Sequence, residues 1–110
     1  MTDRLQQLTD FLKENPNDPF LQYALATEHL KRGHTDEALR YYEGLVTHQP
    51  GYIGTYYHLG KLYEALNRRD EAIMIYEKGM YQAQVKRDFH ARSELQAAYQ
   101  AITDMDDDDE

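Results

Sequence analysis

The chain of 110 residues contains no cysteine and no tryptophan, and it has only three prolines. The absence of cysteine excludes disulfides, thiolate metal sites and cysteine nucleophiles, and it favours a reducing compartment. No apolar run approaches the roughly 20 residues that a membrane-spanning helix needs. The polar start, "MTDRLQQLTD", lacks the apolar core of a signal peptide. We therefore expect a cytoplasmic protein without a membrane segment.

Positive charge is also scarce, since 12 lysines and arginines stand against 20 acidic residues, a net charge of −8. Binding to nucleic acid or to an anionic membrane depends on clustered Lys and Arg, so neither is an expected partner. The stretch "DMDDDDE" concentrates the acids, and we expect residues 105–110 to be a disordered acidic tail. A docking role or a weak divalent-ion site is the alternative, although the tail lacks the glycine and the spaced ligands of a calcium loop.

No pattern in the sequence indicates catalysis. None of the five histidines forms a His-x-x-x-His pair that would present two ligands on one helical face. There is no glycine-rich phosphate loop and no Gly-x-Ser-x-Gly turn. The sequence therefore predicts a protein that is not an enzyme, with no metal site and no cofactor.

Apolar residues recur at intervals of three and four between the prolines and glycines, which predicts an all-α fold of about six helices and no strand. Pro16 ends the first helix, and Asp18 followed by Pro19 begins the second. Gly33 ends the second helix. Thr35 is the expected N-cap of the third, and Asp88 is the expected N-cap of the last.

The stretch "TDEALRYYEGL" at 35–45 returns in a related form, "RDEAIMIYEKG", at 69–79. Each unit reads as helix, tight turn and helix. Gly33 aligns with Asn67, and these two residue types tolerate a left-handed helix end best. The two stretches lie 34 residues apart in the chain. At this offset the identical pairs are Tyr23/Tyr57, Leu25/Leu59, Asp36/Asp70, Glu37/Glu71, Ala38/Ala72, Tyr42/Tyr76 and Glu43/Glu77.

This pattern resembles the tetratricopeptide repeat, a family whose period of about 34 residues equals the offset seen here. The Leu-Gly-x-x-Tyr of that family stands here as "LGKLY", and "LATEH" is its degraded copy in the first unit. Ala38 and Ala72 match the family alanine. Pro50 matches the proline that ends a repeat, and Pro16 lies one full period before it, so the first helix resembles the second half of a repeat.

The resemblance implies a right-handed α-α superhelix of antiparallel helix pairs in one domain over residues 1–104. Its parts would be a half-repeat helix (2–15), repeat 1 (18–50), repeat 2 (52–85) and a capping helix (88–103). Because only Ala or Gly lets two helix backbones approach closely, Ala26 should face Ala38, and Gly60 should face Ala72. Repeats that stack in this way need polar covers at both ends.

In this family the first helix of each unit lines a concave groove, so the resemblance implies a protein–protein interaction module that binds a peptide or a partner protein there. Tyr23 and Tyr57 occupy equivalent positions and would line up along the groove as contact surface for the partner. Lys61 and Arg92 would pair with acidic residues of the partner. A homo-oligomer or an accessory subunit of a larger complex is the alternative. The expected groove residues are Phe20, Tyr23, Thr27, Leu30, Tyr57, His58, Lys61, Glu64 and Arg92.

Some members of the family hold the C-terminal carboxylate of chaperones with a set of Lys, Asn and Arg side chains. The corresponding places here are Tyr23, Thr27, His58, Asp88 and Arg92, and only Arg92 keeps that chemistry. The sequence therefore does not predict binding of chaperone tails.

Overall fold

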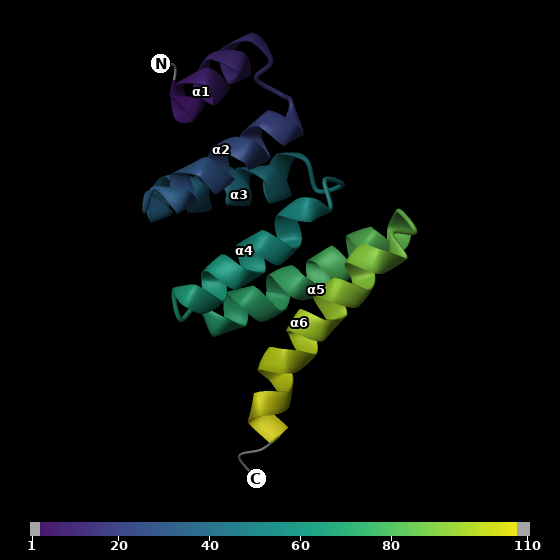
Figure 1. The fold of residues 1–110 in the computed structure, drawn as a ribbon. Helices are drawn as coiled ribbons and strands as arrows, with labels where there is room; N and C mark the ends of the chain where they lie inside the picture. The colour runs from purple at the N-terminus through teal and green to yellow at the C-terminus, as the bar shows by residue number, and fades with distance from the viewer. Residues whose placement is uncertain (1–2, 108–110) are drawn as a thin grey trace. The chain divides into compact units, whose positions relative to one another are not determined.

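The computed structural model describes residues 3–107, with side chains up to residue 104, and all regular structure in this part of the chain is helical. The chain divides after Tyr52 into two compact units. Unit 1 contains α1 (Arg4–Glu14), α2 (Pro19–Lys31) and α3 (Thr35–His48), and unit 2 contains α4 (Gly54–Ala65), α5 (Arg69–Val85) and α6 (Phe89–Asp107) (Figure 1). The all-α prediction is confirmed. The single domain over 1–104 stays a prediction, because the two units are described separately.

In unit 1, α2 and α3 form a packed helical hairpin and α1 packs on α2. Ala26 and Ala38 are fully buried, as are Leu25, Tyr42 and Leu45. The leucines of α1 contact α2, where Leu8 packs with Ala24 and Leu25. The expected helix pair is therefore present in unit 1 with both alanines buried, and their facing each other stays a prediction.

In unit 2, α4 and α5 form the second hairpin, and α6 packs on α5 and also contacts α4 (Figure 1). Gly60 and Ala72 are both buried, and the expectation that they face each other stays a prediction. The atoms closest to a Cβ built on Gly60 belong to the ring of Tyr76, with the nearest carbon at 2.1 Å. Tyr76 lies one helical turn after Ala72, so the glycine makes room for an aromatic ring as well as for a backbone.

Three helices end in the same turn, with one residue in the left-handed region: Gly33 at φ 80°, Asn67 at 60° and Arg87 at 59°. In each turn the next residue donates its backbone N–H to the carbonyl five positions earlier, at 2.8 Å. Gly33 and Asn67 confirm the prediction from the repeat. Arg87 was not expected, because side chains other than those of Asn and Asp adopt this conformation at a higher cost.

Two of the three predicted helix starts are confirmed. Asp18 accepts a hydrogen bond from the backbone N–H of Phe20 (2.9 Å), and Asp88 accepts one from the N–H of Ala91 (3.1 Å). The prediction for Thr35 is wrong, because α3 begins at Thr35 itself and its N-cap residue is His34, which makes no side-chain cap. The backbone N–H of His34 donates to the carbonyl of His29 in this turn. Helix α3 then begins at Thr35, one residue earlier than it would with Thr35 as the N-cap.

The last helix also differs from the expectation, since α6 continues to Asp107 and not only to residue 103. Residues 105–107, which were expected to belong to a disordered tail, are helical. Acidic side chains are unfavourable near the C-terminal end of a helix dipole, so the run of aspartates gave no signal for this extension. Residues 108–110 of the predicted tail lie outside the described part of the chain.

Candidate partner-binding surfaces

The predicted groove residues lie on the first helices of the two hairpins, α2 and α4, and on α6. In unit 1 they border a hollow of about 200 Å³ between α1 and α2, named here the unit-1 hollow. In unit 2 they border a hollow of about 310 Å³ between α4 and α6, the unit-2 hollow. The unit-1 hollow is lined by Arg4, Phe20, Tyr23, Ala24, Thr27, Glu28 and Lys31, and the unit-2 hollow by Tyr57, Lys61, Glu94, Ala97, Ala98 and Ala101.

Tyr23 is an integral part of unit 1. Its ring packs edge-on against Tyr42, with 6.2 Å between ring centroids, and tilts against Tyr52 at 5.9 Å. Burial raises the pKa of its hydroxyl, and Tyr42 and Tyr52 add to that effect. Thr27 lies one turn further along α2, and its Oγ1 lies 3.0 Å from the hydroxyl oxygen of Tyr42. These two groove residues therefore also hold α2 against α3.

Phe20 and Leu30 are the apolar residues that α2 leaves exposed. The ring of Phe20 is 58% exposed at the rim of the unit-1 hollow, whereas Leu30 is 37% exposed and does not line it. The sequence thus placed three residues on this hollow, namely Phe20, Tyr23 and Thr27.

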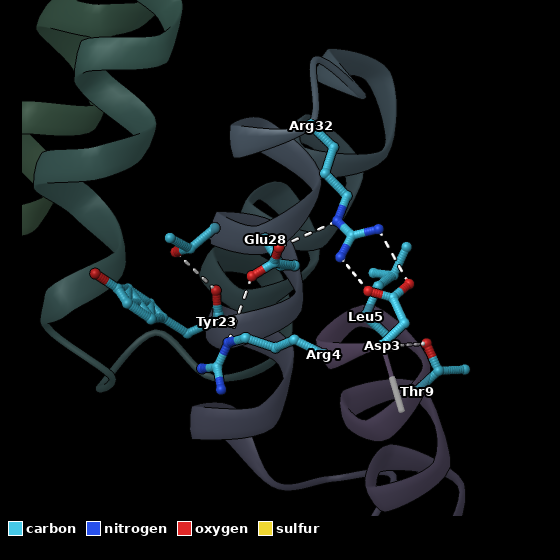
Figure 2. A network of polar contacts seen from close by, with 8 residues as sticks. Asp3, Arg4, Leu5, Thr9, Tyr23, Glu28 and Arg32 are labelled. Atoms are coloured by element: carbon cyan, nitrogen blue, oxygen red, sulfur yellow. Dashed lines mark hydrogen bonds and ion pairs between the residues drawn. The ribbon is translucent and has the colours of Figure 1, made fainter. Parts of the chain in front are cut away.

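A buried carboxylate lies next to Tyr23 in the unit-1 hollow, and the sequence analysis missed it. Glu28 is 8% exposed and accepts from Nε of Arg32 at 3.1 Å, and its other oxygen lies 3.4 Å from Nε of Arg4 (Figure 2). Arg32 also donates from both terminal nitrogens to Asp3, and this contact lowers the pKa of Asp3. The network ties α1 to α2. The repeat indicated that this position is buried, because the equivalent residue in repeat 2 is the apolar Leu62, which is buried as well.

In unit 2, Tyr57 and Lys61 form one wall of the hollow. Tyr57 is 36% exposed, and Nζ of Lys61 lies 5.6 Å from the centroid of its ring. A cation over an aromatic face is attracted by the ring quadrupole. Nζ also lies 3.8 Å from the carboxylate of Glu64, which accepts a hydrogen bond from the hydroxyl of Tyr76. Lys61 therefore contacts two side chains of its own helix, Tyr57 and Glu64.

The opposite wall of the unit-2 hollow comes from α6 and was not predicted. It consists of Glu94 and three alanines at helical spacing, Ala97, Ala98 and Ala101. The sequence analysis assigned none of these four residues to the groove. Alanines at i and i+4 on a helix do not by themselves indicate a binding surface in a sequence. They line the hollow only because of the side of α6 that faces α4, and the sequence pattern does not give that side.

The remaining predicted residues of unit 2 do not line its hollow. The ring of His58 packs edge-on against Tyr57 at 5.8 Å. Partial burial lowers its pKa, and the charge of Glu94 opposes that effect. Glu64 supports Lys61 without lining the hollow, and Arg92 is exposed on α6 and does not line it.

Two histidines of unit 1 are in contact with each other outside either hollow. The Nδ1 atoms of His29 and His34 lie 3.1 Å apart, and the ring of His29 stacks on Tyr41. Repeat 2 carries Tyr63 and Arg68 at these positions, with the guanidinium 4.8 Å from the ring centroid. Burial lowers the pKa of His29, and His34 lowers it further. The hydrogen bond between the two Nδ1 atoms needs a lone pair on one of them as the acceptor. It is therefore lost when both rings are protonated.

We expect acid to destabilise unit 1 through His29. Its pKa in the folded chain lies below its ordinary value of 6.5, so the unfolded chain takes up the proton first as the pH falls. Its contribution is complete above about pH 6.5 and is lost as the pH drops through the folded pKa. Urea unfolding between pH 7.5 and 5 measures this dependence.

The matched variant for this test is His29→Tyr, the residue of repeat 2. It should reduce the dependence of the free energy of unfolding on pH without removing it, because the pKa of His58 is shifted in the same direction. An unchanged dependence in this variant would show that His29 is not its source.

Among the residues that the structure describes, no group of three or more His, Cys, Asp or Glu side chains could hold a metal ion. None of the helices in this part of the chain is both long enough and apolar enough to cross a membrane.

Comparison with known proteins agrees with the architecture. The family model for the tetratricopeptide repeat matches residues 29–102. A tetratricopeptide repeat domain protein from Salinibacter ruber, solved in solution, is 49% identical, covers 79% of this chain and 88% of its own, and has a TM-score of 0.77. A crystal structure of a tetratricopeptide repeat domain protein from the same organism is 48% identical, covers 79% of this chain and 97% of its own, and has a TM-score of 0.75.

A third structure, a protein from Bordetella parapertussis, covers 96% of this chain and 92% of its own with a TM-score of 0.79. At 23% identity it supports the fold alone. Among curated proteins there is no match. The repeat in the sequence, the two helical hairpins with small residues at their contacts and the match over residues 29–102 lead to one conclusion: the chain belongs to the tetratricopeptide repeat family.

Proposed function

We propose that this chain is a non-catalytic interaction module and that the unit-2 hollow binds a peptide segment of a partner protein. The observation that carries the proposal is the pairing of Tyr57 and Lys61 on one wall with the alanines of α6 on the other. Small side chains let a foreign backbone approach, and a tyrosine offers a large contact area at a low cost in conformational entropy. A cytoplasmic location stays a prediction from the sequence.

The charges in the hollow favour a peptide over a small apolar ligand. Lys61 and Glu94 place one cation and one anion beside an aromatic ring, so donors and acceptors of an extended backbone can both be satisfied. The unit-1 hollow offers the same combination, with Lys31, Glu28 and Tyr23, but Tyr23 is engaged with Tyr42 and Tyr52. Unit 2 is therefore the better candidate for the dominant contact.

The test starts with capture of a partner by the intact chain, followed by affinity measurement with the purified partner. Tyr57→Ala should weaken binding by about 30-fold, as expected for an aromatic hot spot worth about 2 kcal/mol. Lys61→Ala should weaken it by about three- to fivefold, with an effect that fades as salt is added.

The matched controls are Tyr81→Ala and Lys86→Ala, which remove the same residue types from exposed positions on or next to α5. Both should bind as the unchanged chain does, and circular dichroism should show that all four variants fold. If Tyr57→Ala binds normally while Tyr81→Ala loses affinity, the partner contacts α5 and the proposal is wrong.

A further inference from the structure

A third hollow, larger than the unit-1 and unit-2 hollows, plays no part in the proposed function. It has a volume of about 550 Å³ and lies in unit 1, between the end of α1 and one face of α3; we name it the α3 hollow. Its lining includes Leu12, Arg40, Tyr41, Gly44, His48 and Gln49.

Gly44 is the first observation, because nothing inside the chain explains it. A glycine inside a helix costs about 0.5–1 kcal/mol relative to alanine. In α4 and α5 the glycines are explained by a neighbouring side chain that leaves no room for a Cβ. A Cβ on Gly60 would meet the ring of Tyr76 at 2.1 Å, and one on Gly79 would meet Tyr56 at 2.6 Å. A Cβ on Gly44 would meet nothing within 4 Å.

The repeat does not require the glycine either, because the equivalent residue of repeat 2 is Lys78. Glycine without an internal neighbour is used where a ligand or another chain approaches the backbone. Gly44 lies on the border of the α3 hollow, so the approaching group would come from this hollow.

The polar side chains on either side of Gly44 are the second observation. Arg40 and His48 stand one helical turn before and after it, on the same face of α3. Both side chains are exposed, and neither has an ion pair or a hydrogen bond to any residue between 3 and 104. No acidic residue lines the hollow. Arg40 is the one residue of the lining with a formal charge at pH 7, so the lining is positive in a chain with a net charge of −8.

We propose that the α3 hollow binds the acidic segment 104–110 of a second copy of this chain. The segment "DMDDDDE" carries six acidic residues. Its first four residues, 104–107, form the C-terminal end of α6. The C-terminal end of a helix is itself the negative end of its dipole. Charge complementarity therefore selects this occupant, and Gly44 gives its backbone room to approach.

The contact joins two different surfaces, so it is heterologous: each copy offers one acidic segment and one α3 hollow. Such contacts close into a ring or extend as an open chain. The proposed function does not depend on this contact, because the unit-2 hollow uses other residues.

Sedimentation velocity of the full chain over a range of concentrations tests the proposal. In low salt the mass should rise above the 13.0 kDa of one chain, and about 0.5 M salt should return it to a monomer, since the contact is electrostatic and exposed. Arg40→Glu should weaken self-association by at least about tenfold through repulsion. Lys86→Glu makes the same change of charge outside the hollow and should have no such effect.

Two further variants separate charge from shape. Gly44→Leu fills the hollow without meeting another residue through its Cβ and should also abolish self-association. A chain with Arg40→Glu in which all six acidic residues of the segment 104–110 are replaced by lysine should associate again, because the signs on both surfaces are then exchanged. The labelled peptide "DMDDDDE" should bind the unchanged chain and not Arg40→Glu.

A chain that remains monomeric at high concentration in low salt would overturn the proposal. Self-association that persists in both Arg40→Glu and Gly44→Leu would overturn it as well, since the contact would then lie elsewhere. Peptide binding that is equal in the unchanged chain and in Arg40→Glu would have the same consequence. None of these results bears on Tyr57→Ala, so failure here and failure of the proposed function can be told apart.

Discussion

Gly60→Ala should lower the free energy of unfolding by about 3 kcal/mol, the upper part of the range for an overpacked core. The new Cβ would lie 2.1, 2.5 and 2.7 Å from three carbons of the Tyr76 ring. That ring is fully buried, and its hydroxyl donates to Glu64, so it cannot swing away. The gain in helix propensity from alanine, about 1 kcal/mol, offsets only part of the cost.

Urea unfolding measures this effect, and Gly44→Ala is the matched control. It makes the same substitution inside a helix where the Cβ meets nothing, so it should stabilise the chain by about 0.5–1 kcal/mol. Opposite signs for the two variants are the expected result. If Gly60→Ala is as stable as the unchanged chain, then α4 and α5 do not pack as described.

A double variant checks that the ring is the cause. Tyr76→Leu alone should be destabilising, because it leaves a cavity. Combined with Gly60→Ala it should cost less than the sum of the two single changes, since the shorter side chain makes room for the methyl group. Simple additivity would mean that the strain at Gly60 arises from another neighbour.

The second large effect is expected for Tyr42→Ala, which should cost about 3–5 kcal/mol. Tyr42 is fully buried at the centre of unit 1, and its ring packs edge-on against Tyr23. Its hydroxyl oxygen lies 3.0 Å from Oγ1 of Thr27. The substitution removes the ring that fills the space between α2 and α3 and leaves a large cavity.

Tyr42→Phe separates the ring from the hydroxyl and should cost about 1 kcal/mol, the usual value for one hydrogen bond. Tyr81→Ala is the control for loss of a tyrosine ring, because Tyr81 is 66% exposed and surface changes usually stay within about 0.5 kcal/mol. Urea unfolding of the three variants gives the comparison. Equal losses for Tyr42→Ala and Tyr81→Ala would contradict the described core.

The repeat indicated which positions are small and which are large, but not which atoms meet. Ala38 and Ala72 were predicted to be buried, and both are. The contact of Gly60 with the ring of Tyr76 was not predicted, because the alignment of one repeat on the other does not give the direction of each side chain. Gly79 was not recognised as a contact point, although it receives Tyr56 from α4 and Leu95 from α6.

The candidate site was predicted on one side only. Tyr57 and Lys61 were found through the alignment of the two repeats, which places them on the first helix of a hairpin. Glu94, Ala97 and Ala101 were not found, because α6 lies beyond the repeated part and its rotation about its own axis cannot be read from the period. Glu28 was missed for another reason: a carboxylate is read as solvated unless its arginine partners are known.

The sequence by itself determined the six helices, most of their ends and the two turns at Gly33 and Asn67. These features depend on neighbours within four or five residues: apolar spacing, a cap at Asp18 and a residue that tolerates a positive φ. Tertiary structure alone decided that Tyr76 lies on Gly60, that two arginines surround Glu28 and that Gly44 borders an open hollow. Such contacts join residues that are distant in the chain, and they depend on the direction of each side chain in space.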